Sequence, residues 1–395
     1  MQHFYKNPKE LAKVLASIYA EERIVRIDDK STSLVPFKVT EMTLNEDKES
    51  LKIKEDFNYM AVNKNTATYL QIFSDSFKDF VMKNPYKAED EEKELIKTTA
   101  LKESLPLSNL ALSQYLEKTL GSGLLSSSLS KRKGEIKPEL VTLSNIKNSS
   151  NYKNKELLLR VRNNIVSAVL SDNYKMLDID ILADTLIEKF PYNLSFEYAY
   201  MDQERTSIIY KVGNSIDRQI KSILFPKTDI DLDVLVTLTS GDLGTQSVVL
   251  RSFIRLNHKT KLMLGSKLSL SHIGDNLDKR WEEYCRDYLI DLIRVSTKDL
   301  NELKDLRIKN PNRAIKNLLD YLNAPTSDTI LIPVQLFKSF YRNKSCTAFD
   351  IYVTINEVLS NMEAEDYSLN SIIRIREDLS RLVKNSGFKQ FDEFK

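Results

Sequence analysis

QSVVLRSFIRL, residues Gln246–Leu256, is the longest segment of the chain that alternates as a β-strand does. Side chains along a strand point alternately to its two faces. One face carries the apolar side chains and one small polar residue, namely Val248, Leu250, Ser252, Ile254 and Leu256. The other face carries Arg251, Phe253 and Arg255. The segment predicts a strand with one face toward a core and a basic, aromatic opposite face.

More basic residues follow this strand. They are His258, Lys259, Lys261 and Lys267, and no acidic residue occurs before Asp275. Arginine can bind phosphate while an aromatic ring stacks on a base, so the Arg251, Phe253 and Arg255 face is typical of a surface for single-stranded nucleic acid. The alternatives are a solvated strand face, or a Phe253 that is buried by the N-terminal part of the chain.

A second strand candidate lies upstream and is acidic. In Thr228–Val236, Asp229, Asp231 and Asp233 fall on one strand face. Carboxylates at this spacing can hold magnesium, and the segment resembles the aspartate strand of nucleotidyltransferases of the polymerase-beta type. In the same comparison, the segment from Gly213 to Ser215 stands where those enzymes carry a Gly-Ser pair. The alternative is an exposed edge strand whose charges suppress aggregation.

Elsewhere the chain has the pattern of an α+β protein. Helical spacing occurs over 7–23, 65–83, 106–120, 178–190, 277–295, 297–307, 311–323, 348–362 and 367–385. Further strand candidates are 24–27, 34–37, 51–54, 194–200, 207–212 and 232–238. We expect a helical N-terminal part, a central mixed or antiparallel sheet with flanking helices, and a helical C-terminal part.

Polar linkers suggest three regions. Residues 1–147 read as a mostly helical region with short strands, 148–296 as a central α+β domain, and 297–395 as a helical region. Within the first, residues 121–138 form a serine- and lysine-rich loop. Its basic group, Lys131, Arg132 and Lys133, would add phosphate contacts to a nucleic-acid surface.

Composition limits the function classes. The 395 residues have a formal net charge of +2, so binding to a polyanion requires local clustering of charge. Nine glycines argue against a glycine-rich nucleotide loop, and two cysteines exclude a disulfide framework. No apolar run approaches the ~20 residues that span a bilayer, and the N-terminus lacks a signal-peptide core. We therefore expect a cytoplasmic protein with no membrane partner.

Three blocks occur in an order that resembles a known family. They are Val169–Asp178, Thr239–His272 and Thr347–Glu357. Together they look like the phage/plasmid-like proteins grouped as domain of unknown function 932, over roughly residues 105–385. The resemblance implies a phage, prophage or plasmid origin, and hence the cytoplasm of a bacterial host. It implies no activity, because the family has no secure one.

These observations favour a nucleic-acid-binding protein of a mobile element that acts without catalysis and without a cofactor. Handling of single-stranded DNA, or its annealing, in recombination or replication is the leading hypothesis. Its contacts would be Arg251, Phe253, Arg255, Lys259, Lys261 and the group at 131–133. Because one near-neutral chain offers few contacts, we expect a homo-oligomer. Two alternatives stay open: a magnesium-dependent nucleotidyltransferase that uses Asp229 and Asp231, and a phage factor that binds a host or phage protein, as an anti-defence or particle component.

Overall fold

The computed structural model describes residues 3–20, 22–28, 32–44, 51–63, 104–120, 156–162, 165–202, 205–241, 243–324, 327, 330–365, 367–384 and 387–393. The chain divides into two compact units. Unit 1 contains Met1–Ala12, Met176–Asp242 and Gln246–Lys395, and unit 2 contains Lys13–Lys175 and Leu243–Thr245. The suggested C-terminal region and most of the suggested central region therefore belong to unit 1, whereas residues 148–175 of the central region belong to unit 2.

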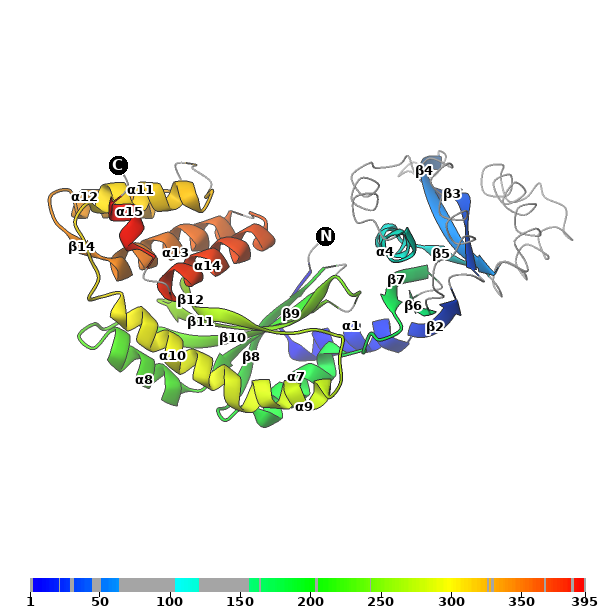
Figure 1. The fold of residues 1–395 in the computed structure, drawn as a ribbon, viewed down its shortest axis with the longest axis horizontal. Helices are drawn as coiled ribbons and strands as arrows, with labels where there is room; N and C mark the ends of the chain where they lie inside the picture. Colours follow the sequence, from blue (N-terminus) through cyan, green and yellow to red (C-terminus); the bar gives the residue numbers. More distant parts are fainter. Residues whose placement is uncertain are drawn as a thin grey trace, which may run out of the picture. The chain divides into compact units, whose positions relative to one another are not determined.

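Unit 1 is built on a six-stranded sheet in the order β1-β8-β9-β10-β11-β12 (Figure 1). Its strands are β1 (His3–Tyr5), β8 (Leu194–Met201), β9 (Thr206–Val212), β10 (Leu232–Gly241), β11 (Gln246–Leu256) and β12 (Thr260–Leu270). Every neighbouring pair is antiparallel. The segment that the alternation singled out is strand β11, with the predicted bounds.

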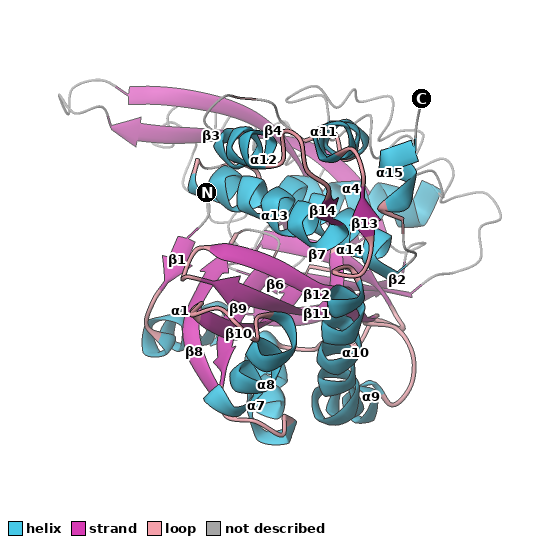
Figure 2. Cartoon of the chain, turned by 90° about the vertical axis from the view of Figure 1, so that its left-hand side faces the viewer, coloured by secondary structure: helices cyan, strands magenta, loops and turns pink. Residues whose placement is uncertain are grey.

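Helices cover both faces of this sheet (Figure 2). One layer contains α7 (Ile179–Lys189), α8 (Asn214–Leu224), α9 (Leu277–Glu283) and α10 (Leu289–Glu302). The π-helical turn η2 (Tyr284–Tyr288) joins α9 to α10. The opposite layer contains α11 (Pro311–Tyr321), α12 (Ile332–Phe340), α13 (Ala348–Ala364), α14 (Leu369–Lys384) and α15 (Lys389–Glu393). Of this second layer, α13 and α14 pack directly on β12.

The two faces of the sheet differ in chemistry. The face of β11 that carries Val248, Leu250, Ile254 and Leu256 is buried, as expected for a core. Its neighbours on β10, such as Val234 and Val236, are buried as well. This face is largely apolar, whereas the face beneath α13 and α14 combines apolar side chains with several buried or half-buried charges.

The long edge strand β12 is protected by side chains of the covering helices. The Tyr352 hydroxyl on α13 donates to the Met263 carbonyl at 2.6 Å, and the Lys261 amide donates to Ser360 Oγ at 3.3 Å. Gly265 interrupts the strand with a φ of 66°, and Ser296 of α10 lies against it. A β-carbon there would approach Ser296 Oγ to 2.1 Å. Only glycine fits this close approach without rearrangement.

Unit 2 contains a second six-stranded sheet, in the order β2-β6-β7-β5-β4-β3. Its strands are β2 (Glu22–Asp28), β3 (Thr32–Leu44), β4 (Leu51–Asn63), β5 (Ser104–Leu107), β6 (Glu156–Arg162) and β7 (Ile165–Ser171). The helix α4 (Asn109–Leu120) packs on β7, and Gln114 accepts a hydrogen bond from the Val169 amide at 2.8 Å. On β6, the buried Arg160 pairs with Glu22 at 2.8 Å.

The α+β fold class is confirmed. The predicted helix over 7–23 is α1 (Pro8–Ala20), and the short strands near residues 24, 34 and 51 are longer than predicted. The elements that were not predicted include α8, β12, α12 and α15. The sequence also predicts separate helices over 277–295 and 297–307, whereas α9, η2 and α10 run without interruption from Leu277 to Glu302. The predicted helix at 65–83 and the loop at 121–138 lie outside the described residues.

Among the helices of the described residues, none is both long enough and apolar enough to cross a bilayer.

Candidate nucleic-acid interface

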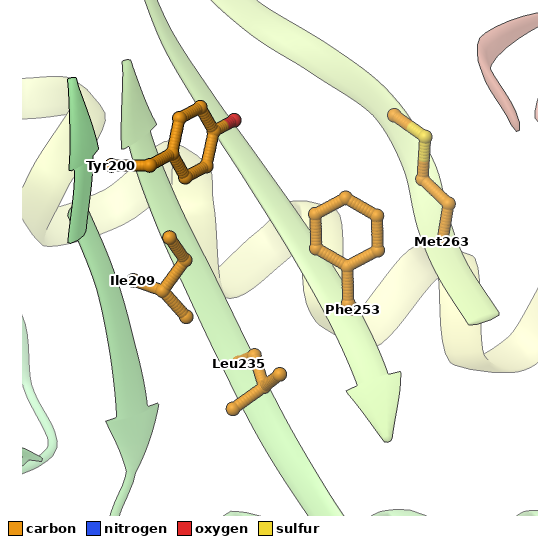
Figure 3. Close-up of a cluster of buried hydrophobic side chains, with 5 residues drawn as sticks. All are labelled: Tyr200, Ile209, Leu235, Phe253 and Met263. Carbon is orange, nitrogen blue, oxygen red and sulfur yellow. The ribbon is translucent and has the colours of Figure 1, made fainter. Parts of the chain in front are cut away.

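The basic, aromatic face of β11 does not lie open. Arg251 is 4% exposed, Phe253 is 7% exposed and the Arg255 side chain is 13% exposed. Figure 3 shows Phe253 among Tyr200, Ile209, Leu235 and Met263, which come from four other strands. The expectation that this trio forms an accessible polynucleotide surface is therefore wrong.

Helix α14 covers the first arginine. Arg251 Nη2 lies 2.7 Å from Glu377 Oε1, and Lys267 Nζ lies 3.0 Å from the other carboxylate oxygen. Burial raises the pKa of Glu377, but the hydrogen bonds from Arg251 and Lys267 outweigh it, and the pKa lies below its usual value. One carboxylate thus neutralises two of the cations that the sequence offers to nucleic acid.

A second group of charges surrounds Arg255. Its guanidinium donates to Asp233 at 2.6 Å and to Glu197 at 2.6 Å, and Lys211 also pairs with Asp233. Burial raises the pKa of Asp233, but Lys211 and Arg255 together bring the pKa below its usual value. Asp233 is therefore an internal counter-ion, and it is the one of the three predicted aspartates that pairs with the basic face predicted for β11.

A third group fixes the end of α13 to β12. Lys261 Nζ lies 2.8 Å from Glu363, and Arg376 on α14 pairs with the same carboxylate. Burial raises the pKa of Glu363, yet Arg376 and Lys261 outweigh it, so the pKa is lowered. Arg376 also lies over the Phe253 ring, 5.9 Å from its centroid. Lys261 is a half-buried structural cation rather than a free phosphate contact.

The remaining predicted contacts have different outcomes. Lys259 is exposed, in the turn that connects β11 to β12. Its neighbours Asn257 and His258 both have positive φ angles, as the two central residues of a type I′ turn require, and the Lys259 amide donates to the Leu256 carbonyl at 3.0 Å. Lys131, Arg132 and Lys133 lie outside the described residues. Of the predicted contacts Arg251, Phe253, Arg255, Lys259 and Lys261, only Lys259 keeps the accessibility that the hypothesis requires.

The carboxylates of the alternative magnesium site do not converge. The Asp229 side chain is fully exposed and lies 3.8 Å from Lys221, whereas Asp231 pairs with His258 Nε2 at 3.1 Å. Asp233 is occupied by the cations described above. Over the part of the chain that is described, no three His, Cys, Asp or Glu side chains gather as a metal site would require. Gly213 is the N-cap of α8, so the Gly-Ser resemblance marks a helix start.

A basic segment that the sequence analysis missed lies in the C-terminal layer. Residues 304–344 contain eight Lys or Arg and three Asp or Glu, a net charge of +5. The whole chain carries +2, so the remainder carries −3. The signal was available in the sequence as a local excess of charge over 41 residues.

The fold brings some of these cations together. Arg307 Nε donates to Ser345 Oγ at 2.8 Å, and β13 (Arg307–Ile308) pairs with β14 (Cys346–Thr347). Arg307 therefore lies beside the turn that leads from α12 to β14, which carries Arg342 and Lys344. We call Arg307, Arg342 and Lys344 the basic turn. All three residues are exposed.

The three cations of the basic turn form no ion pair within the described residues, although the Asp392 carboxylate accepts hydrogen bonds from the nearby amides of Lys309 and Asn310 at 2.8 Å. In this respect the three cations differ from Arg251, Arg255 and Lys261, each of which pairs with a carboxylate. Lys344 Nζ lies over the Phe340 ring, 5.1 Å from its centroid, which leaves the ammonium group able to meet an anion. Three further cations of the segment, Lys309, Arg313 and Lys316, are also exposed.

Comparison with protein-family models, with curated proteins and with solved structures finds no match for the chain.

Proposed function

We propose that the chain is a nucleic-acid-binding protein of phage or plasmid type that acts without catalysis and contacts phosphates through the basic turn. The observation that carries the proposal is the exposure of Arg307, Arg342 and Lys344 beside one another, with no acidic partner in the described chain. The resemblance to the phage/plasmid-like proteins adds the setting of a mobile element. Arginine and lysine at the surface are the usual phosphate contacts of such proteins.

The proposal differs from the original prediction in the kind of contact. An aromatic ring that stacks on a base is not available at β11, because Phe253 is enclosed by Tyr200, Leu235 and Met263. Binding would therefore depend on counterion release at phosphates. Three phosphate contacts predict a slope of log affinity against log salt of about −2 for single strands and about −3 for duplex DNA. Affinity would fall by about 20- to 40-fold between 50 and 200 mM salt.

The test is a fluorescence-anisotropy titration of the full chain with labelled single-stranded DNA, duplex DNA and RNA at two salt concentrations. The variant Arg342→Glu/Lys344→Glu reverses two charges of the basic turn. A matched control, Arg218→Glu/Lys298→Glu, makes the same change in net charge at exposed positions of α8 and α10. We expect the first variant to lose at least tenfold in affinity and a large part of the salt slope, with the control within about twofold of the parent chain.

Two results would overturn the proposal. One is the absence of salt-dependent binding by the parent chain to any of the three nucleic acids. The other is an equal loss in both variants, since that would show a response to overall charge alone. The nucleic acid that binds most tightly in this titration shows whether the protein prefers single strands or a duplex. A strand-annealing assay with complementary oligonucleotides then tests the role in recombination or replication.

A further inference from the structure

Phe340, the last residue of α12, exposes a large aromatic ring. Its side chain is 65% exposed, and it ends a row of exposed apolar side chains that also contains Ile332 and Leu336. The three residues are spaced by four positions, so they lie along one side of the helix. Phe340 differs from the other two because it lies where the helix meets the basic turn.

The Phe340 ring is held in place by other aromatic residues. Tyr341 lies edge-on to it, with 4.8 Å between the ring centroids and 79° between the ring planes. Tyr341 in turn packs on the buried Phe337, whose ring centroid is 4.7 Å away. A ring that is already fixed loses little conformational freedom when a ligand stacks on it. The end of α12 therefore presents an exposed ring in a preformed orientation.

The basic turn brings its cations to this ring. The Lys344 amide donates to the Tyr341 carbonyl at 3.3 Å, so the chain folds back toward the end of α12. Lys344 Nζ then lies 5.1 Å from the centroid of the Phe340 ring. The other two cations of the basic turn, Arg307 and Arg342, are exposed as well. An aromatic ring flanked by cations, which the sequence predicts at β11, is thus found at the end of α12.

Carboxylates near the basic turn accept hydrogen bonds from backbone amides at helix starts. Asp350 accepts from the Thr347 amide at 2.8 Å, within the capping box of α13. Asp392 accepts from the amides of Lys309 and Asn310, directly before α11. The three cations of the basic turn pair with neither carboxylate, so their charge can act on a phosphate next to the ring.

We propose that Phe340 stacks on an unpaired base, so that the basic turn selects single-stranded nucleic acid. Arg342 and Lys344 would contact the phosphates that flank the stacked base. In a duplex both faces of a base are covered by its neighbours, so a ring at the protein surface gains nothing from them. The stacking contact rests on the proposed function, because it adds a base contact to the phosphate contacts of the same site.

The position of the cations favours a nucleotide over other occupants of α12. They gather at the Phe340 end of the row, as a phosphate beside a stacked base requires. A membrane or an amphipathic peptide would use Ile332 and Leu336 as much as Phe340, whereas stacking needs the ring alone. A comparison of substitutions at positions 336 and 340 therefore distinguishes these occupants.

The first test measures the affinity of the full chain for a labelled single-stranded oligothymidine, for the same strand without its bases, and for a duplex. Phe340→Ala should lose at least about fivefold in affinity for oligothymidine and stay within about twofold for the other two probes. Phe340→Trp should keep the affinity of the parent chain, because an indole also stacks on a base. Leu336→Ala, at a 67% exposed position of the same row, is the matched control and should bind as the parent chain does. Oligouridine in place of oligothymidine distinguishes RNA from DNA.

The second test detects stacking by fluorescence. The parent chain has one tryptophan, Trp281, which is 2% exposed. In Phe340→Trp a stacked base quenches the new indole, so oligothymidine should reduce the emission and the strand without bases should not. Ile181→Trp, at a 63% exposed position of α7 in the other helical layer, should respond to neither strand.

The outcomes distinguish the stacking contact from the proposed function. If Arg342→Glu/Lys344→Glu loses affinity for all three probes while Phe340→Ala loses none, the basic turn binds phosphates and the stacking contact is wrong. Equal losses in Phe340→Ala and Leu336→Ala would also overturn it, since they would show a broader apolar contact. So would equal affinity of the parent chain for oligothymidine and for the strand without bases. A parent chain that binds none of the probes would overturn both proposals.

Discussion

Arg251 on β11 and Glu377 on α14 form a buried ion pair between residues that are 126 positions apart in the chain. The carboxylate accepts hydrogen bonds from Arg251 Nη2 at 2.7 Å and from Nε at 3.1 Å. Both side chains are largely removed from water, so each ion depends on the other for compensation. The pair joins the sheet to the helical layer that covers it. Arg251, which the sequence predicts as a nucleic-acid contact, therefore has a structural role.

Glu377→Gln is expected to destabilise unit 1 by about 3 kcal/mol, because the substitution leaves Arg251 buried without a counter-ion. The measurement is the free energy of unfolding in urea. Asp378→Asn serves as the control, since Asp378 pairs with the well-exposed Arg381 and such surface pairs contribute under about 1 kcal/mol. Equal losses in the two variants would contradict an important role for the buried pair.

Acid should weaken the same layer. The pKa values of Asp233, Glu363 and Glu377 are lower in the folded chain than their usual values. A group of this kind contributes stability above its unfolded pKa, near 4, and loses that contribution as the pH falls through its folded pKa. We expect the urea concentration at the unfolding midpoint to decrease once the pH is below about 4. We also expect hydrogen exchange in β11 and α14 to become faster in the same range. An unchanged midpoint down to pH 3 would show that these ion pairs contribute little.

The sequence could indicate which side chains share a face of β11, but not what covers that face. Alternation is a local property, whereas the partners of Arg251 and Lys261 are Glu377 and Glu363, each more than 100 residues further along the chain. The sequence of β11 carries no sign that α14 packs on this face of the sheet. The pairing of Arg255 with Asp233 is different, because the sequence indicates both segments as strand candidates of opposite charge, although we did not predict that they pair.

Helix α12 is a second feature that could not be predicted from the sequence. The helix reads IPVQLFKSF, with apolar residues on nearly every side and a proline at its second position. Such a segment has no clear period of 3.6, so neither the helix nor its exposed row was predictable from pattern. The basic segment 304–344, by contrast, could have been predicted from charge counts alone.

Asp217 on α8 predicts a pH effect of the opposite sign. Burial raises its pKa to about 6, although the carboxylate accepts a hydrogen bond from the Val234 amide at 2.9 Å. A raised folded pKa means that the folded chain holds a proton that the unfolded chain has released, so this group costs stability as the pH rises from about 4 to 6. The cost is fully present at neutral pH.

Asp217→Asn should therefore stabilise unit 1 by about 1 kcal/mol at pH 7.5, since the amide oxygen can still accept from Val234 without a buried charge. The gain should shrink toward pH 5, where the aspartate becomes protonated. Thermal unfolding of the two chains at both pH values measures it. A variant that is less stable than the parent chain at every pH would show that the carboxylate has a stabilising partner.

Arg255→Ala separates a structural role from a binding role at the strand that first suggested nucleic acid. Arg255 donates to both Asp233 and Glu197, so its removal leaves Asp233 with Lys211 as the remaining close cation. Breaking a largely buried ion pair in this way should cost about 3 kcal/mol of unfolding free energy. At a temperature where the variant stays folded, its affinity for nucleic acid should equal that of the parent chain, because the guanidinium is held by Asp233 and Glu197 and the side chain is only 13% exposed. A loss of affinity of more than about tenfold in a folded Arg255→Ala chain would restore β11 as part of the binding surface and would require the helical layer to move.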